Sequence, residues 1–137
     1  MAYRPRFPKL SAVAIITLGS PHEAQSTQKG KVIMVLLDFS MTPLGKGESV
    51  SPYVARCLEV VAASGLEYRL HAMGTTVEGE LDQVLAVVRR CFEVLHTDCD
   101  RVSCSVKIDS RKGPGGRLRS KVQKVQALVG RPLQTGD

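Results

Sequence analysis

Apolar residues recur along this chain with two different spacings, and four segments have the spacing of strands. Residues 32–40 begin as a continuous apolar run with hydrophobic side chains on both alternating faces, which predicts a buried strand covered on both sides. Residues 66–73 and 101–111 alternate apolar with polar side chains, so each predicts a strand with one buried face. Gly74 permits a tight reversal, and the short segment 75–78 after it completes a predicted hairpin.

Three other segments have the spacing of helices. Ser51 is expected to cap the first helix, Pro52 suits its first turn, and Gly65 is expected to end it in a left-handed conformation. A second helix is expected over residues 80–96, with acidic residues in its first turn, where the helix dipole favours them. After a glycine-rich break, a narrower apolar stripe over residues 118–129 predicts a basic C-terminal helix.

The predicted order is strand, helix, strand, strand, helix, strand, followed by the C-terminal helix. This order is typical of a ferredoxin-like α+β sandwich, in which two helices pack on one face of a four-stranded antiparallel sheet with strand order 4-1-3-2. The opposite sheet face then carries Val32, Met34 and Leu36 on a central strand, uncovered by the two main helices. Because an exposed apolar patch marks an interaction surface, we expect a homo-oligomer packed sheet face on sheet face. The C-terminal helix would cover part of the same surface or reach a neighbouring subunit.

The length of 137 residues suits one domain, which we place at residues 31–130, followed by a short tail at 131–137. We interpret residues 1–30 as an N-terminal extension. Their basic start and short apolar stretch also suit a secretory signal or a transit peptide, although no clean cleavage site follows. The apolar stretch is too short to cross a membrane, so we expect no membrane association.

The net charge of +6 is concentrated at the two ends of the chain. Residues 1–30 carry +3 and residues 112–137 carry +5, whereas residues 31–111 carry −2. A protein that binds nucleic acid specifically carries its basic patch on the fold itself, so this distribution argues against such a function. The outward positions of the fourth strand also lack the aromatic residues on which bases stack.

The cysteine and histidine residues form no recognisable metal or catalytic motif. Four cysteines are present without a C-x-x-C pair, and the three histidines are scattered, so we expect no metal site. We interpret the thiols as reduced, with Cys57, Cys91 and Cys104 in the core, and expect a cytoplasmic protein. The sequence holds no Ser-His-Asp order, activated Cys–His pair or carboxylate cluster, and therefore predicts neither an enzyme nor a cofactor.

Two segments that are far apart in the sequence are predicted to form a small-molecule pocket. In the 4-1-3-2 sheet the first two strands run parallel, which brings residues 40–51 close to residues 71–75. Hydroxyls, backbone N–H groups and a histidine would converge there around an apolar slot formed by two methionines. The predicted ligand-binding residues are Asp38, Ser40, Met41, Thr42, Pro43, Gly45, Ser49, Ser51, His71, Met73, Gly74 and Thr75.

Several parts of this predicted pocket also have a structural explanation. Ser51 is expected to act as a helix cap, the loop glycines shape a turn, and His71 belongs to the outward set of its strand. The segment 45–49 lacks the spacing of a phosphate-binding loop, and Glu48 opposes an anion. An anion at the N-terminus of the first helix is still physically reasonable, which leaves a phosphorylated ligand open.

Three spaced motifs lie in the central part of the chain. Residues 43–55 read P-L-G-K-G-E-S-V-S-P-Y-V-A, and two further motifs fall within residues 64–79 and 107–111. Together they resemble the signatures of the thiamine-binding, YkoF-like family, over about residues 31–126. The resemblance implies ferredoxin-like subunits assembled into dimers and tetramers, in a cytoplasmic, non-catalytic protein that binds thiamine or its hydroxymethylpyrimidine part. Asp38 or Asp109 would then face the cationic thiazolium ring.

A second hypothesis is a structural or regulatory interaction module that binds a protein partner through the open sheet face. It predicts a stable monomer or an exchangeable dimer when the protein is alone. The vitamin-binding hypothesis predicts a homo-oligomer instead, so the two hypotheses differ in an observable property.

Overall fold

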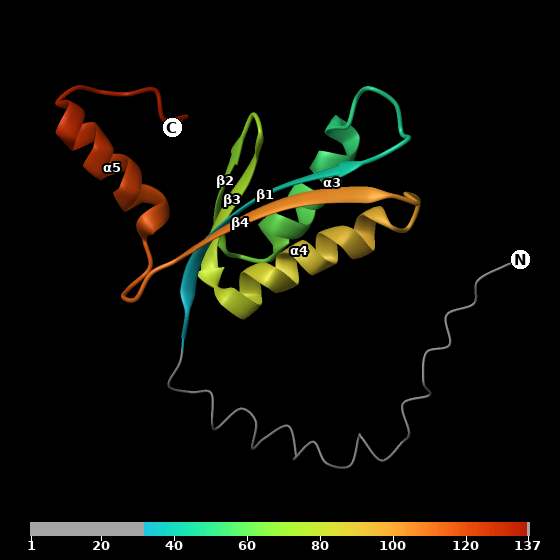
Figure 1. The fold of residues 1–137 in the computed structure, drawn as a ribbon, viewed down its shortest axis with the longest axis horizontal. Coiled ribbons are helices and arrows are strands. Elements are labelled where there is room, and N and C mark those ends of the chain that lie inside the picture. Colours follow the sequence, from blue (N-terminus) through green and yellow to red (C-terminus); the bar gives the residue numbers. More distant parts are fainter. Residues whose placement is uncertain (1–31, 137) are drawn as a thin grey trace, which may run out of the picture. The chain divides into compact units, whose positions relative to one another are not determined.

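The computed structural model describes residues 32–136, and the predicted extension at residues 1–30 lies outside this range. Four strands and three helices follow one another along the described chain (Figure 1). In chain order they are β1 (Met34–Pro43), α3 (Ser51–Ala63), β2 (Glu67–His71), β3 (Gly74–Glu80), α4 (Leu81–Leu95), β4 (Val102–Ser110) and α5 (Arg117–Val129). This order of strands and helices is the predicted one.

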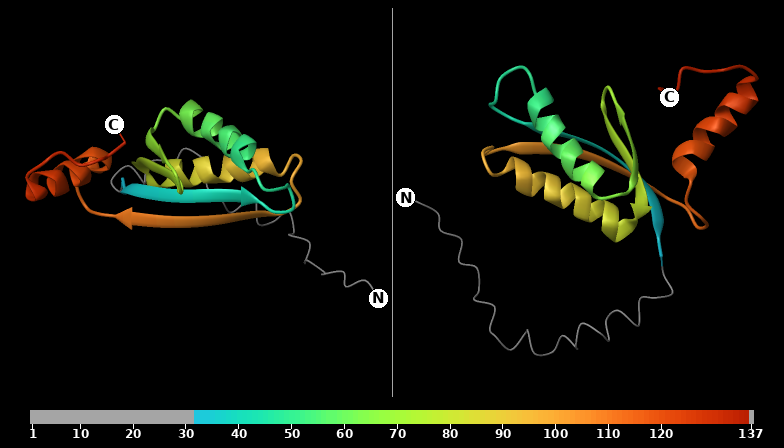
Figure 2. Two further views of the ribbon diagram at one scale, coloured as in Figure 1. Left: turned by 90° about the horizontal axis from the view of Figure 1, so that it is seen from above. Right: turned by 180° about the vertical axis from the view of Figure 1, so that it is seen from behind.

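The four strands form one antiparallel sheet in the order β2-β3-β1-β4, which is the predicted order counted from the other edge. β1 lies in the interior of the sheet, where Leu37 pairs with Val77 of β3 on one side and with Ile108 of β4 on the other. α3 and α4 lie together on one face of the sheet, as the two views in Figure 2 show. The predicted ferredoxin-like α+β sandwich is therefore confirmed.

The hydrophobic core fills the space between this sheet face and the two helices. Its buried side chains come from alternate positions of β1, from β3, from the facing stripes of α3 and α4, and from the loop after α4. They are Val35, Leu37, Phe39, Met41, Cys57, Val61, Val77, Val84, Val87, Val88, Cys91, Leu95 and Cys99. Removing this apolar surface from water is the main driving force for folding.

The cysteines are free thiols, and two of the three predicted core cysteines are buried, as is Cys99, which was not predicted to lie in the core. Cys57 and Cys91 are buried in the core, whereas Cys104 is only partly buried and packs against its edge. The contact of the Cys91 thiol with Cys57, together with its burial, raises the pKa of Cys91. A thiol that stays protonated and buried is a packing residue instead of a nucleophile.

The first strand, predicted over residues 32–40, both begins and ends later than predicted. β1 begins at Met34 and continues to Pro43, because its ladder with β4 runs on to the pair formed by Pro43 and Val102. Residues 41–43, which follow the end of the predicted strand, therefore belong to the strand. The Leu44 backbone N–H then donates to the Arg101 carbonyl at 2.8 Å and prolongs the contact beyond the strand.

The start of the first helix also differs from the prediction. Ser51 is the first residue of α3, and the N-cap position is Val50, which has no side-chain capping bond. The Val50 carbonyl instead accepts backbone N–H groups from Tyr53 and Val54, both at 3.0 Å. The predicted capping role of Ser51 is therefore wrong, whereas Gly65 has the expected left-handed conformation, with φ of 72°.

The fourth strand is less buried than its alternation predicted. Val106 and Ile108 were expected to face the core, yet they are 45% and 42% exposed. β4 is an edge strand, and α3 and α4 pack mainly over β1 and β3. The alternating pattern thus identifies the strand correctly but overstates how far the helices cover it.

The C-terminal helix covers part of the opposite sheet face. Glu78 of β3 is 5% exposed, and its two carboxylate oxygens accept the backbone N–H groups of Arg117 at 2.9 Å and Leu118 at 3.0 Å. The Arg117 side chain donates through Nη2 to the carbonyl oxygen of Met34 at 2.8 Å. These contacts attach the first turn of α5 to the central strands, while the rest of α5 extends away from the sheet (Figure 1).

Candidate functional site

A pocket of about 270 Å³, here called the hairpin pocket, lies where β1 ends and the β2–β3 hairpin turns. Three segments form its walls: the end of β1, the first turns of α3, and the hairpin. Its lining residues are Phe39, Ser40, Met41, Thr42, Val50, Val54, Cys57, Leu58, Leu70, Ala72, Met73, Gly74 and Thr75. None of these side chains carries a formal charge, so the pocket suits an uncharged, partly apolar group.

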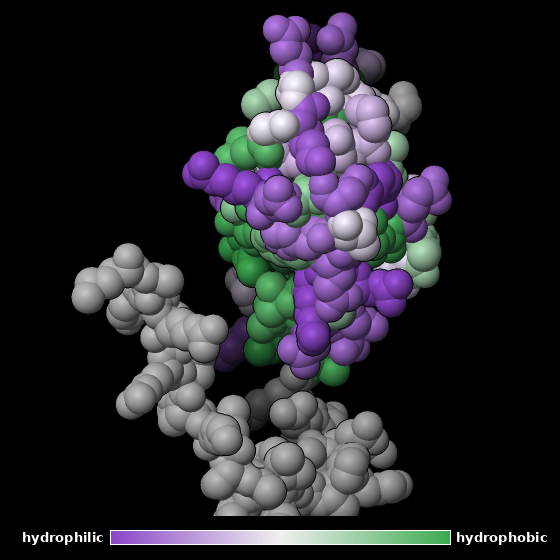
Figure 3. Space-filling model, turned by 90° about the vertical axis from the view of Figure 1, so that its right-hand side faces the viewer, coloured by the Kyte–Doolittle hydropathy of each residue, from purple (hydrophilic) through white to green (hydrophobic). Residues whose placement is uncertain are grey.

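The hairpin pocket brings together the two segments that the sequence placed at one sheet edge. The predicted residues among its lining are Ser40, Met41, Thr42, Met73, Gly74 and Thr75. Pro43, Gly45, Ser49 and Ser51 do not line it. Gly45 and Ser49 lie in the exposed loop over residues 44–49, Pro43 is buried at the end of β1, and Ser51 is exposed at the start of α3. The view in Figure 3, toward the right-hand side of Figure 1, shows mostly hydrophilic residues. The glycine-rich loop therefore adjoins the pocket at Val50 without forming its wall.

The alternation of β1 decides which groups reach the hairpin pocket. Phe39 and Met41 are buried on the helix side of the sheet, so the side chains of Ser40 and Thr42 face the other side. These two residues consequently offer backbone groups to the pocket. Thr75 pairs with Phe39 across the sheet and is 3% exposed, which puts its hydroxyl on the pocket side.

Gly74 is needed where the hairpin approaches β1. A Cβ atom at this position would lie 2.7 Å from the carbonyl oxygen of Phe39, much closer than a carbon and an oxygen can pack. The absence of a side chain therefore lets the hairpin close against the end of β1 and narrow the pocket.

The predicted site residues did not include the apolar wall that α3 contributes to the hairpin pocket. Val54, Cys57 and Leu58 come from the face of α3 that packs on the sheet. Their helical spacing was visible in the sequence and indicated a buried face, but that pattern does not distinguish a core position from a pocket wall.

Asp38 and His71, both predicted as ligand contacts, lie on the opposite, open face of the sheet. The Nε2 atom of His71 lies 2.7 Å from Oδ1 of Asp38, and the Thr76 hydroxyl donates to the same oxygen at 2.7 Å. The Met73 backbone N–H donates to Nδ1 of His71 at 3.3 Å, so both ring nitrogens are engaged. Burial alone would raise the pKa of Asp38, but the hydrogen bonds from His71 and Thr76 outweigh it and hold that pKa below its usual value.

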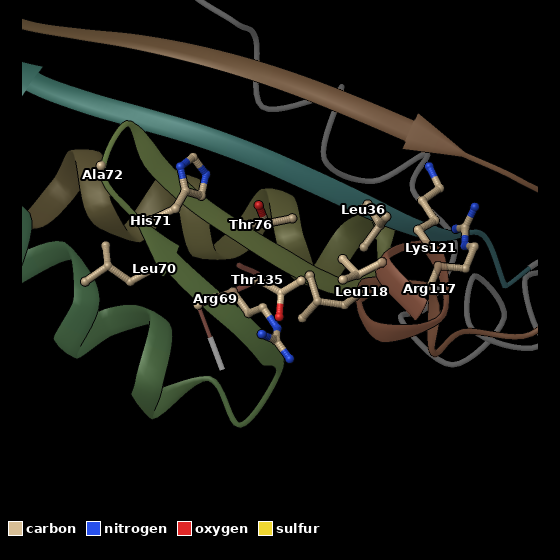
Figure 4. Close-up of a pocket in the computed structure, with 12 residues that line it drawn as sticks. Leu36, Arg69, Leu70, His71, Ala72, Thr76, Arg117, Leu118, Lys121 and Thr135 are labelled. Atoms are coloured by element: carbon tan, nitrogen blue, oxygen red, sulfur yellow. The ribbon is translucent and has the colours of Figure 1, made fainter. Parts of the chain in front are cut away.

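A second, larger cavity of about 710 Å³ lies on this open face beneath α5, and we call it the α5 cavity. It shares Leu70 and Ala72 with the hairpin pocket, and side chains from β1, β2, β3 and α5 surround it (Figure 4). Its lining residues are Leu36, Arg69, Leu70, His71, Ala72, Thr76, Arg117, Leu118, Lys121, Val122, Thr135 and Gly136. The lining is basic and apolar, and it contains no carboxylate.

The described residues contain no other arrangement of obvious chemical use. Within residues 32–136, no group of three or more His, Cys, Asp or Glu side chains is placed to hold a metal ion. Over the same range, none of the helices is both long enough and apolar enough to cross a membrane. Two further pockets, of about 400 Å³ between α3 and α4 and about 490 Å³ along α5, contain none of the residues predicted as ligand contacts.

Comparison with known proteins identifies a family. The family model described as thiamine-binding protein matches residues 37–126. A UPF0045 protein of Synechocystis is 37% identical over 100 residues, which cover 72% of this chain and 83% of that protein. A UPF0045 protein of Methanocaldococcus jannaschii is 38% identical over 94 residues, which cover 69% of this chain and 94% of that protein.

Solved structures show the same fold. A hypothetical protein of Methanocaldococcus jannaschii superposes with a TM-score of 0.60 at 35% identity, covering 72% of this chain and 98% of the other. A Thermotoga maritima protein named for thiamine biosynthesis or salvage superposes with a TM-score of 0.58 at 20% identity, covering 66% and 98%. The second likeness supports the fold alone. By the extent of the family match, this chain belongs to the thiamine-binding protein family.

Proposed function

We propose that this protein binds thiamine or its hydroxymethylpyrimidine part in the hairpin pocket, and that it catalyses no reaction on the ligand. The observation that carries the proposal is the family match over residues 37–126, a range that contains every wall of the hairpin pocket. The proposal thus rests on family membership for the ligand and on the geometry of the pocket for the site.

The size and lining of the hairpin pocket suit the pyrimidine ring better than the whole vitamin. Drug-sized ligands occupy pockets of roughly 300–1,000 Å³, and the hairpin pocket, at about 270 Å³, lies just below that range. Met41 and Met73 offer soft apolar surfaces to the faces of the ring. The hydroxyl of Thr75 can pair with a ring nitrogen or with the amino group, and Ser40 and Thr42, which pair with β4, complete the adjoining wall.

The α5 cavity is a poorer site for the vitamin. The thiazolium ring of thiamine is a cation, and the cavity presents Arg69, Arg117 and Lys121 without a carboxylate among its lining residues. Like charges repel strongly where water is excluded. The ion pair between Lys121 and Asp109 neutralises part of this charge, but the lining itself still offers no carboxylate to a cation. The cationic half of thiamine is therefore expected at the mouth of the hairpin pocket.

We also propose that the protein forms a homo-oligomer through the open face of the sheet. Half-buried Met34 and Leu36 lie on the open face of the sheet, and α5 exposes Val122, Val125 and Val129 beside it. Packing two sheet faces together would remove this apolar surface from water. We also propose a cytoplasmic location, because the four cysteines are free thiols.

Calorimetric titration of the full-length protein with hydroxymethylpyrimidine and with thiamine tests the proposed function. Saturable heat with hydroxymethylpyrimidine is expected, with sedimentation of the same sample showing a dimer or tetramer. The absence of heat at millimolar concentrations of both compounds, from a folded oligomer, would refute the proposal. A monomer that binds neither compound would favour the interaction-module hypothesis.

A further inference from the structure

Two cysteine thiols meet where α3 packs against α4. Cys57 of α3 and Cys91 of α4 are both buried, and the two helices lie side by side on one face of the sheet (Figure 2). The Cys91 thiol donates to the carbonyl oxygen of Cys57 at 3.7 Å, and the two thiol groups are also hydrogen-bonded to each other. A disulfide joins its sulfur atoms at about 2 Å, so neighbouring thiols on adjacent helices are the geometry from which such a bond can form.

Cys57 is reached through the hairpin pocket. Its thiol lines that pocket, whereas Cys91 does not, and the residue as a whole is only 3% exposed. The pocket extends to the surface, because Met73 in its lining is 82% exposed. A water molecule takes up roughly 30 Å³ in the liquid, so a pocket of about 270 Å³ has room for hydrogen peroxide, which has only two heavy atoms.

The two thiols differ in their readiness to react. The hydrogen bond from Cys91, helped by the guanidinium of Arg56, outweighs burial and lowers the pKa of Cys57. The same hydrogen bond, together with burial, raises the pKa of Cys91, which is therefore unreactive in the reduced protein. Redox-sensing cysteines have a low pKa, access for the oxidant and a second thiol beside them, and Cys57 has all three.

The other two cysteines lack this combination. Cys99 lies in the loop after α4, where its thiol contacts the carboxylate of Asp98, and Cys104 lies on β4, where its thiol contacts the carbonyl of Ser105. Neither lines the hairpin pocket, and burial raises the pKa of both thiols. They are consequently internal controls for the reactivity of Cys57.

We propose that Cys57 is a site of oxidation by hydrogen peroxide and that Cys91 is its disulfide partner. The Cys57 thiolate attacks one peroxide oxygen, the O–O bond breaks, and the hydroxide that leaves takes up the Cys57 proton to become water. Cys57 is then a sulfenic acid. The Cys91 sulfur attacks the Cys57 sulfur, the S–S bond forms, and the sulfenic hydroxyl leaves with the Cys91 proton as a second water molecule. The two thiols thus lose two electrons, and peroxide is reduced to two water molecules.

The disulfide changes the hairpin pocket. It joins α3 to α4 and draws the Cys57 sulfur away from the pocket wall, so an occupant of the pocket meets a different surface. A transient, redox-sensing disulfide is the kind that a reducing compartment allows. The proposal does not rest on vitamin binding, because the thiol pair and its access belong to the protein without a ligand.

Mapping of the disulfide tests the proposal. The reduced full-length protein is treated with hydrogen peroxide, its remaining thiols are alkylated in denaturant, and it is digested with trypsin and Glu-C. Glu-C cuts after Glu93 and so separates Cys91 from Cys99, which share a tryptic peptide. One linkage between the peptides of Cys57 and Cys91 is expected, reversed by dithiothreitol, and Cys57 should lose its reactivity toward the alkylating agent about tenfold faster than Cys99. Four thiols that all remain alkylated, a linkage that includes Cys99 or Cys104, or oxidation of Cys57 without a linkage would overturn the proposal.

Two alanine variants separate the partner thiol from a buried thiol of no special role. In Cys91→Ala, Cys57 is expected to stop at the sulfenic acid, which dimedone traps, with no disulfide formed. Cys99→Ala is the matched control, since it removes another buried thiol from outside the pair, and it should form the disulfide at a rate within about twofold of the original protein. Equal slowing in both variants, or a disulfide of Cys57 formed as fast in Cys91→Ala, would contradict the assignment. The mapping of the unmutated protein decides the question even if a variant fails to fold.

Discussion

Replacing Glu78 by glutamine is expected to loosen the attachment of α5 to the sheet. Both carboxylate oxygens of Glu78 accept backbone N–H groups from the first turn of α5, at 2.9 and 3.0 Å, in a site that is 5% exposed. Glutamine keeps one acceptor oxygen and turns its amide N–H₂ group toward the second donor. One hydrogen bond to a charged acceptor contributes about 1.5–3 kcal/mol, and a buried donor left without a partner costs a similar amount. We therefore expect α5 to become less stable by about 2–3 kcal/mol.

Hydrogen exchange of the α5 amides measures this loss where it occurs. Because α5 packs chiefly on β3, the change should appear as local opening of the helix while the core of the sheet keeps its protection. A loss of about 2 kcal/mol speeds exchange through local opening by about 30-fold.

A matched control uses the neighbouring glutamate on the same sheet face. Glu67 pairs with Glu78 across the β2–β3 ladder and also contacts α5, but only through the exposed side chain of Arg119, at 2.6 Å. Glu67→Gln should change the stability of α5 by less than about 1 kcal/mol, as is usual for exposed ion pairs. Unchanged exchange in Glu78→Gln, or equal acceleration in both variants, would refute the role assigned to Glu78.

Two further predictions concern the hairpin and the open face. In urea unfolding, Gly74→Ala should lower the free energy of unfolding by about 1–3 kcal/mol, because the new Cβ overlaps the Phe39 carbonyl. Gly45→Ala meets nothing within 4 Å but has φ of +80°, so it should cost only about 1–2 kcal/mol. An unchanged free energy of unfolding in Gly74→Ala would contradict the close approach. The pKa of the Asp38 carboxyl, followed by NMR, should lie below the usual value for an aspartate and should rise toward it in His71→Ala. Because its pKa is lowered by folding, its stabilising contribution is complete above the unfolded pKa and is lost as the pH falls through the folded one.

The order of the strands and helices could be predicted because each one has a recognisable pattern in its own stretch of sequence. The two-residue and helical spacings separate strands from helices, Gly65 ends α3 in a left-handed conformation, and Gly74 lies where the hairpin closely approaches β1. The topology followed from that order, and it placed the end of β1 beside the β2–β3 turn correctly. The end of β1 was harder, since the pairing of Pro43 with Val102 depends on a strand that is distant in sequence.

The chemistry of the sites was less predictable, because it depends on which side of the sheet each group faces. Asp38 and His71 were grouped with Met41 and Thr75, yet the pleat sends the two pairs to opposite faces. The α5 cavity left no signal in the sequence. The contact between Glu78 and the start of α5 joins positions about forty residues apart in the sequence. In the sequence alone, a basic helix end indicates only a solvent-exposed surface.

Adjacent threonines on β3 allow the most direct test of the proposed binding site. Thr75 lines the hairpin pocket, and Thr76 lines the α5 cavity on the other face of the same strand. Valine at either position keeps the shape and removes the hydroxyl. In calorimetric titrations with hydroxymethylpyrimidine, Thr75→Val should weaken binding about fivefold, which corresponds to about 1 kcal/mol for one lost hydrogen bond, and Thr76→Val should leave the affinity unchanged. Weakening by Thr76→Val alone, or unchanged affinity in Thr75→Val, would contradict the assignment of the hairpin pocket as the pyrimidine site.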